Sequence, residues 1–445
     1  MKITKLLFKT IAIVLLALAG ATNASAQLNI YIVGSNGDRT PTQKAIQTLL
    51  EASGGWSFQG NRGTATNSSP NNALNSNFGA WNGRYKGTNV IIRTSFIGAV
   101  GAVRSLAGLQ PERYVVANGS GTNATFDIYL NTNAVLNGNS TNGYTTNLPN
   151  IALSTVFQGT TPYTGAGYDT LTESSVGVSP IVFVASPGSG LTNITTQLAQ
   201  NLYQNGFLTA AQFSGNAADT NKIIFALGRN YDAGQRFAVL AETGTGTASS
   251  VNHWQPSITG TTTNAANIVI GGRVTNQILW PRETISGNDS VSAGNSGYST
   301  GALLASALTV TNIATNAIKD TFGYAIPGAT AAYYIGYITT GDYNTTIATN
   351  GPGGTPLATL LSYNGVPYSS NNVINGAYTS WVYNRVLERS DARLPGGTLA
   401  NPTIASFKDD LVNTITTTTG GVNGGILIGD LKVGRTADGG VVTPN

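Results

Sequence analysis

Residues 28–52, LNIYIVGSNGDRTPTQKAIQTLLEA, combine the features of a strand, a turn and a helix in that order. A mostly apolar run is followed by Gly-Ser-Asn-Gly, and Thr40-Pro41 then begins a segment whose apolar residues have helical spacing. In such a β–turn–α unit, the turn presents backbone N–H groups at the end of the strand. The stretch therefore predicts an α/β fold with polar groups where strands give way to helices.

The same order recurs along the chain. Residues 89–108 read as a strand ending in Thr94-Ser95, a glycine-bearing turn and a helix of small residues, and residues 222–244 repeat the pattern. Residues 176–188, VGVSPIVFVASPG, are apolar without alternation, which is typical of a strand buried on both faces. Alternating strands and helices predict mixed, mostly parallel sheets, with ligands at the carboxyl ends of the strands.

Three further segments give more specific expectations. Residues 191–206 have the pattern of a helix with Thr192 as its cap and Gly206 as its end. Residues 54–87 are rich in Gly and Asn, which predicts a polar surface insertion. Residues 362–387 predict a hairpin-like stretch followed by an aromatic helix.

The first 26 residues have the composition of an export signal. Lys2, Lys5 and Lys9 precede an apolar run at residues 11–20, and the small residues 24–26 suit a cleavage site. We expect a periplasmic or secreted protein that does not span the membrane once the signal is removed. Removal of three lysines from 23 Lys+Arg leaves 20 against 19 Asp+Glu, so the charge gives no reason to expect nucleic-acid binding.

The scarcity of reactive side chains argues against catalysis. The chain has no cysteine, which excludes disulfides, thiol nucleophiles and a lipoprotein anchor, and its one histidine, His253, cannot form a two-histidine metal site. No lysine-bearing phosphate loop is present. Carboxylates distant in sequence could still meet in space. We expect a protein that is not an enzyme and has no cofactor, no catalytic residue and no metal site.

Four stretches together resemble a known family: YIVGSNGDRTPTQ, TSFIGAVGAVRSLAG, IALSTVFQ and GRNYDAGQR, taken in chain order. They are similar to the ligand loops of periplasmic phosphate-type substrate-binding proteins of ABC importers. The resemblance implies a type II periplasmic-binding-protein-like fold with two lobes and a hinge. It also implies that lobe I comprises residues 27–184 with 338–445, and lobe II residues 185–337. The implied function is capture of a small oxyanion for a membrane ABC permease.

The resemblance also implies a ligand-binding set, in which Arg229 supplies the charge. That set consists of Ser35, Asn36, Thr40, Thr94, Ser95, Ser154, Thr155, Arg229, Gly234 and Gln235. Three places depart from the family pattern. Ala233-Gly234-Gln235 stands where a serine and a threonine flank glycine, Thr155 stands where an acid is expected, and Ala99 stands where a hydroxyl is common.

Other interpretations of the same residues stay open. Each hydroxyl could form only local turn bonds, and Asp232 could serve as an ordinary helix N-cap. Arg236 is expected to face solvent or Glu242. The alternative function is a non-transport surface, matrix or interaction protein on the same scaffold.

Overall fold

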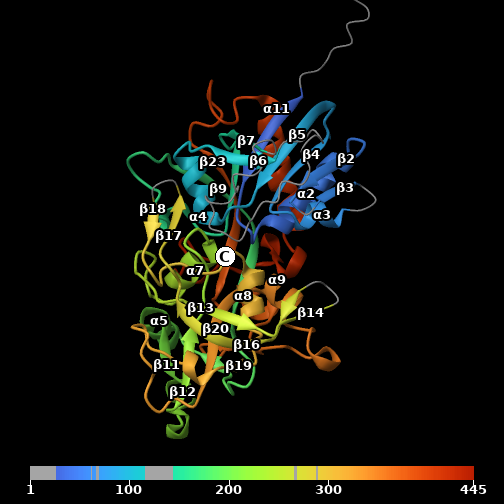
Figure 1. The fold of residues 1–445 in the computed structure, drawn as a ribbon. Helices are drawn as coiled ribbons and strands as arrows, with labels where there is room; N and C mark the ends of the chain where they lie inside the picture. Colours follow the sequence, from blue (N-terminus) through green and yellow to red (C-terminus); the bar gives the residue numbers. More distant parts are fainter. Residues whose placement is uncertain (1–26, 62, 67–69, 116–143, 265–267, 287–288) are drawn as a thin grey trace, which may run out of the picture.

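The computed structural model describes residues 27–61, 63–66, 70–115, 144–264, 268–286 and 289–445 (Figure 1). The expected export signal, residues 1–26, lies outside this part of the chain. The fold is α/β with one 13-stranded mixed sheet, and it has two lobes, an upper one and a lower one in Figure 1. The expected fold class is confirmed.

The upper or first lobe contains the half of the sheet ordered β23-β8-β1-β5-β4-β2-β3. Its strands are β1 (Leu28–Val33), β2 (Trp56–Gly60), β3 (Gly63–Thr66), β4 (Phe78–Tyr85), β5 (Thr88–Ser95), β8 (Ile151–Ser154) and β23 (Trp381–Arg389). Strand β1 pairs in parallel with β5 and β8, as the β–turn–α order predicts, and the other pairs are antiparallel.

The lower or second lobe contains β11 (Phe207–Thr209), β12 (Lys222–Ala226) and β20 (Ala331–Thr339), of which β12 and β20 are parallel. Strand β9 (Leu171–Ala185) belongs to both lobes, because its residues up to Pro180 pair with β23 and those from Ile181 pair with β20. Two short strands, β21 (Thr359–Leu360) and β24 (Ile426–Leu427), also pair with β9. The numbered lobe boundaries given above stay a prediction.

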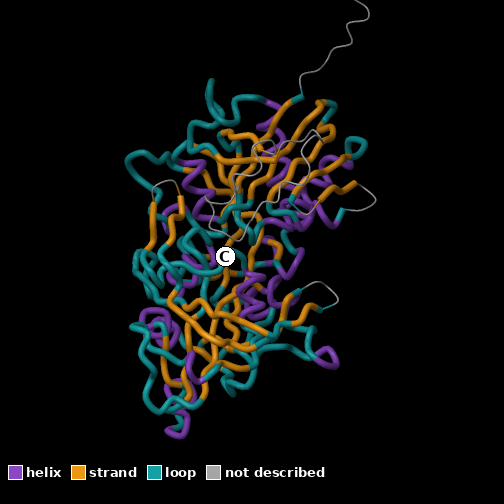
Figure 2. Tube along the Cα trace, viewed as in Figure 1, coloured by secondary structure: helices purple, strands orange, loops and turns teal. Residues whose placement is uncertain are grey.

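The helices cover the sheet and form the junctions between strands (Figure 2). They are α2 (Arg39–Glu51), α3 (Asn71–Asn75), α4 (Ala99–Ala107), α5 (Thr196–Asn205), α6 (Ala211–Ser214), α7 (Gly234–Glu242), α8 (Gly301–Ala307), α9 (Thr340–Thr346), α10 (Ser370–Ile374) and α11 (Pro402–Thr414). Helix α5 ends at Gly206, which is left-handed, as expected, but its cap is Thr195 rather than Thr192, because the Thr195 hydroxyl accepts from the Leu198 amide.

Small sheets of two or three strands lie outside the 13-stranded sheet. They are β6 (Glu112–Val115) with β7 (Tyr144–Asn147), β10 (Asn193–Ile194) with β22 (Ser362–Tyr363), β13 (Trp254–Thr259) with β16 (Arg273–Leu279) and β19 (Asn312–Ile313), β14 (Thr262–Thr263) with β15 (Val269–Ile270), β17 (Glu283–Ser286) with β18 (Asp289–Val291), and β25 (Val433–Gly434) with β26 (Thr443–Pro444).

Two sequence predictions are wrong. Residues 54–87 are no surface insertion, since they supply β2, β3 and β4, and the alternating Trp56, Phe58, Trp81 and Tyr85 side chains are buried. The predicted aromatic helix near residue 381 is strand β23, which lies between β9 and β8 with both faces covered. A strand covered on both faces loses the polar alternation by which strands are recognised.

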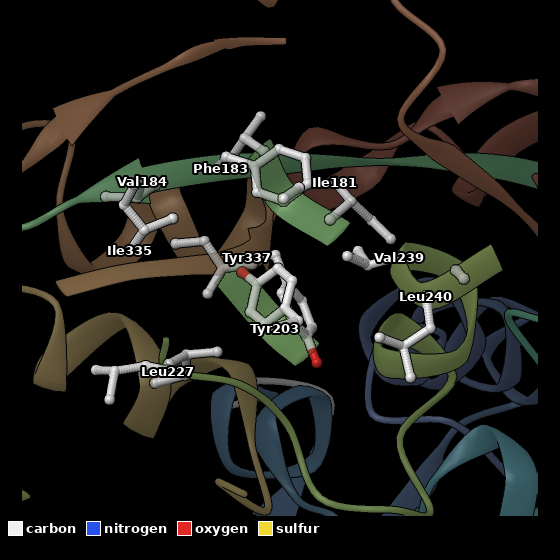
Figure 3. Packing of buried hydrophobic residues seen from close by; sticks show 14 of the residues in the cluster. Ile181, Phe183, Val184, Tyr203, Leu227, Val239, Leu240, Ile335 and Tyr337 are labelled. Atoms are coloured by element: carbon white, nitrogen blue, oxygen red, sulfur yellow. The ribbon is translucent and has the colours of Figure 1, made fainter. Parts of the chain in front are cut away.

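Two buried apolar clusters hold the lobes together. In the first lobe, Ile30 and Ile32 of β1 pack with α2 and α11, whereas Val33 faces the other cluster with α4. In the second lobe, Tyr203 of α5 and Tyr337 of β20 project together beneath β9 and beside α7 (Figure 3). None of the helices in the described ranges has both the length and the apolar character needed to cross a bilayer.

Candidate functional site

Three strand-to-helix junctions meet where the lobes face each other. The Val100 amide at the start of α4 donates to the carbonyl of Asp232, just before α7, over 3.1 Å. Gly98, with φ of 122°, packs against the same residue, where a Cβ would come within 2.9 Å of the Asp232 carbonyl carbon. A Cβ at Gly234 would lie 2.6 Å from that of Ala99. Glycine at positions 98 and 234 therefore lets the starts of α4 and α7 touch.

The turn between β1 and α2 closes the same region from the first lobe. The amide of Gly98 donates to the carbonyl of Gly34 over 3.0 Å, which joins this turn to the α4 junction. The Ser35 hydroxyl accepts from the Gly37 amide at 3.0 Å and lies 3.5 Å from the hydroxyl of Thr155. Hydroxyls from two neighbouring strand ends thus stand side by side beneath the start of α7.

Arg229 lies in the loop before α7, and it is only 2% exposed. Its Nε and Nη2 donate to the carbonyl oxygens of Tyr298 and Ser299, each at 2.9 Å. Because these two nitrogens form one edge of the planar guanidinium, two successive carbonyls fix its orientation. The Nη1 atom donates to Oε1 of Gln235.

The electrostatics of Arg229 are unusual for a buried cation. Burial lowers the pKa of its guanidinium to about 10, and the more distant charge of Asp342 opposes that shift. Within the described part of the chain, no carboxylate lies within ion-pair distance of Arg229. A buried cation without a contacting counter-ion carries a large desolvation cost, which an anion at its outer edge would offset.

The ten expected ligand residues divide into two groups. Five of them belong to one series of contacts that ends at Arg229: Ser35, Asn36, Thr155, Gly234 and Gln235. Asn36 belongs to this group because its Nδ2 donates over 3.5 Å to the Ser299 carbonyl, the same oxygen that orients Arg229.

The remaining expected residues are engaged elsewhere or lie at the edge of the region. The Ser154 hydroxyl bonds to the backbone of Val156, and the Thr94 hydroxyl accepts from Gln43 at 3.2 Å beneath α2. Thr40 lies in the first turn of α2 and is half-buried. Ser95 is buried at the end of β5, and its hydroxyl has no hydrogen-bond partner among the residues that the structure describes.

Two expectations for the α7 loop are wrong. Asp232 does not cap α7, whose N-cap is Ala233, because its carboxylate pairs with Arg104 of α4 at 3.0 Å in a fully buried salt bridge. Arg236 does not face solvent or Glu242. It is buried and donates through Nη2 to Asn295, while Glu242 pairs with Arg435.

Several contributors to the site carry no readable signal in the sequence. The Tyr298 and Ser299 carbonyls act through the backbone, and any residue type has a carbonyl. Asp38 is buried at the N-cap of α2, beside Gly37. Within the described part of the chain neither of its carboxylate oxygens has a hydrogen-bond partner, and burial raises its pKa well above the ordinary range. Its position after the Gly-Ser-Asn-Gly turn could have drawn attention to it. The described residues contain no cluster of three or more metal-binding side chains.

Comparison with known proteins gives a likeness in structure alone. No protein-family model matches the chain, and no curated protein matches it in sequence. The expected resemblance to phosphate-type substrate-binding proteins is found among solved structures. An ABC-type phosphate transport receptor from Vibrio cholerae has 11% identity and a TM-score of 0.38, over 87% of this chain and 98% of that one.

Two other solved structures have similarly low identity and TM-score over most of the chain. PstS from Borrelia burgdorferi has 10% identity and a TM-score of 0.38, over 90% of this chain and 98% of its own. A phosphate ABC transporter substrate-binding protein with bound phosphate from Clostridium perfringens has 11% identity and a TM-score of 0.36, over 88% and 94% of the two chains. A likeness this distant carries no argument about ligand or partner, so function has to be argued from the site itself.

Proposed function

We propose that this chain is an exported solute-binding protein that captures a small, phosphate-like oxyanion between its two lobes for an ABC importer. The proposed role is binding rather than catalysis. The observation that carries it is the Arg229 guanidinium, which is buried, held in one orientation by two carbonyls, and not in contact with a carboxylate of the described residues.

The surroundings of Arg229 suit an anion. The starts of α4 and α7 and the turn before α2 lie in contact, so the N–H groups and partial positive charge of helix N-termini add to the guanidinium. Hydroxyls of Ser35 and Thr155 stand beside them and can donate to oxygen. In this proposal the ligand binds at the outer edge of Arg229 and the two lobes close around it.

Isothermal titration calorimetry of the mature protein tests the proposal with phosphate, sulfate, a phosphonate and a small neutral sugar. We expect heat from at least one oxyanion and none from the sugar. Because Thr155 can donate as well as accept a hydrogen bond, we expect sulfate and phosphate to bind within about tenfold of each other. Absence of binding by every oxyanion would reject the proposal.

Matched variants separate the binding role of Arg229 from general stability. Arg229→Met should abolish oxyanion binding, while Arg236→Met removes an equally buried guanidinium seven positions further along and should leave binding measurable. Circular dichroism would establish that both variants are folded. Equal loss of binding in the two variants would show that Arg229 has no specific role.

A second candidate function is supported by the surface of the lower lobe. Phe322 and Tyr324 are 84% and 72% exposed, on a turn whose backbone amides donate to the Asp320 carboxylate. Exposed aromatic residues on an ordered turn are typical of protein interaction sites. This arrangement favours the alternative of a non-transport interaction protein, which predicts no calorimetric response to any of the oxyanions.

A further inference from the structure

We propose that the Gln235 side chain competes with the oxyanion for Arg229. The Gln235 amide oxygen accepts a hydrogen bond from the guanidinium nitrogen that the ligand would contact. The inference rests on the proposed function and names the residue that sets the affinity of the same site. It differs from the sequence expectation, in which Gln235 is a member of the ligand-binding set.

The first step is the geometry of Arg229. Its Nε and Nη2 atoms are engaged by the carbonyls of Tyr298 and Ser299, so the edge available to another molecule is the outer one, which includes Nη1. Gln235 Oε1 accepts from that Nη1 atom. A ligand oxygen seeking the outer edge of the guanidinium therefore meets an acceptor that already bonds there.

The second step is that Gln235 is held in place. It lies in the first turn of α7 and is only 4% exposed, so its side chain is enclosed rather than free to turn into solvent. A Cβ at Gly37 would lie 4.0 Å from its Nε2 atom. The amide thus reaches from α7 to the turn before α2, across the region where an oxyanion would have to fit.

The third step is the difference in charge. An amide oxygen offers Arg229 a dipole, whereas an oxyanion offers a full negative charge, and hydrogen bonds between two charged groups are the stronger kind. An oxyanion can therefore displace Gln235, but its apparent affinity is lowered by the bond that it replaces. Removal of the competing amide should tighten binding by on the order of tenfold.

Calorimetric titration of inorganic phosphate and sulfate into three proteins tests the inference: wild type, Gln235→Ala and Gln235→Glu. Gln235→Ala should bind about tenfold more tightly than wild type. Gln235→Glu places a carboxylate against Arg229 and should abolish binding. Gln200→Ala is a control, because the Gln200 Nε2 atom donates to the Gly244 carbonyl beyond the C-terminal end of α7, and its loss should leave affinity unchanged.

The outcomes are distinct. Unchanged or weaker binding by Gln235→Ala, with wild type still binding, would overturn the competitor role and leave the proposed function standing. If neither wild type nor Gln235→Ala binds phosphate or sulfate, the competitor role and the proposed function are both overturned. Thermal unfolding gives a readout without ligand, because Gln235→Glu should raise the melting temperature through a buried ion pair with Arg229, and a fall would contradict the Arg229–Gln235 contact. Gln235→Ser replaces Gln235→Ala if the latter does not fold.

Discussion

Among single residues, the partner of a buried charge decides what that charge does for stability. Arg104 and Arg236 are equally buried, but Arg104 pairs with Asp232 at 3.0 Å. Among the described residues Arg236 forms no ion pair, and its Nε and Nη1 atoms have no hydrogen-bond partner. Loss of one member of a buried ion pair leaves the other charge uncompensated, which lowers stability strongly. Replacement of a buried charge that has few hydrogen-bond partners by an apolar side chain of similar size lowers stability little.

We therefore expect Arg104→Met to lower the free energy of unfolding by about 3–5 kcal/mol. Arg236→Met should lower it by less than about 1 kcal/mol, or raise it. Urea unfolding followed by circular dichroism measures both changes. Comparable losses in the two variants would show that the Arg104–Asp232 pair adds nothing beyond the packing of its side chains.

Asp38 gives the second prediction at this scale, which concerns pH. Burial raises the pKa of its carboxyl well above its value in the unfolded chain, near 4. A raised pKa means that the folded protein binds the proton more tightly, so this group stabilises the fold at low pH and that contribution is lost as the pH rises through the folded-state pKa.

Asp38→Asn mimics the protonated form and should be more stable than wild type at pH 7, with a difference that shrinks toward pH 4. Urea unfolding at a series of pH values measures it. Asp410→Asn is the control, since the pKa of that half-exposed carboxyl is lowered and its loss should have the opposite pH trend. A wild type more stable than Asp38→Asn at pH 7 would contradict the prediction.

At the scale of elements, glycines decide whether β2, β3 and β4 can close over the Phe58 ring. A Cβ at Gly79 of β4 would overlap that ring, whereas a Cβ at Gly159 would meet nothing within 4 Å. Gly79→Ala should therefore lower the free energy of unfolding by roughly 1–3 kcal/mol, and Gly159→Ala should change it little. Thermal unfolding of the two variants tests this, and a neutral Gly79→Ala would mean that the ring can move aside.

The same elements show where the sequence informs and where it does not. The units that contain α2, α4 and α7 were predictable, because each combines an apolar strand, a glycine-bearing turn and a helical repeat within a short stretch. The strands of residues 54–87 and β23 were not, since pairing with distant strands overrides weak local preference. The sequence singled out Arg229 as a candidate, but the Tyr298 and Ser299 carbonyls that orient it could not be predicted, because every residue type has a carbonyl.

At the scale of the whole molecule, strand β9 and the contacts around Asp232 are among the links between the two lobes. Strand β9 pairs with both half-sheets, and the Asp232 carboxylate and carbonyl bind Arg104 and Val100 of the first lobe. A lobe movement of the kind that solute capture requires has to break the Asp232 contacts, while β9 can bend without breaking. The Arg104–Asp232 pair should therefore hold the lobes together.

Distance measurement between spin labels tests this role of Asp232. Since the chain has no cysteine, Asn413→Cys on α11 and Phe322→Cys in the lower lobe can be labelled selectively, and both positions are exposed. We expect one narrow distance distribution with Asp232 present and an added population of longer distances in Asp232→Asn, because a neutral amide pairs weakly with the buried guanidinium. Asp409→Asn, which alters an exposed salt bridge of α11, should leave the distribution narrow. Identical distributions with and without the Asp232 charge would mean that the lobes are held by other contacts, such as β9 and the Glu242–Arg435 ion pair.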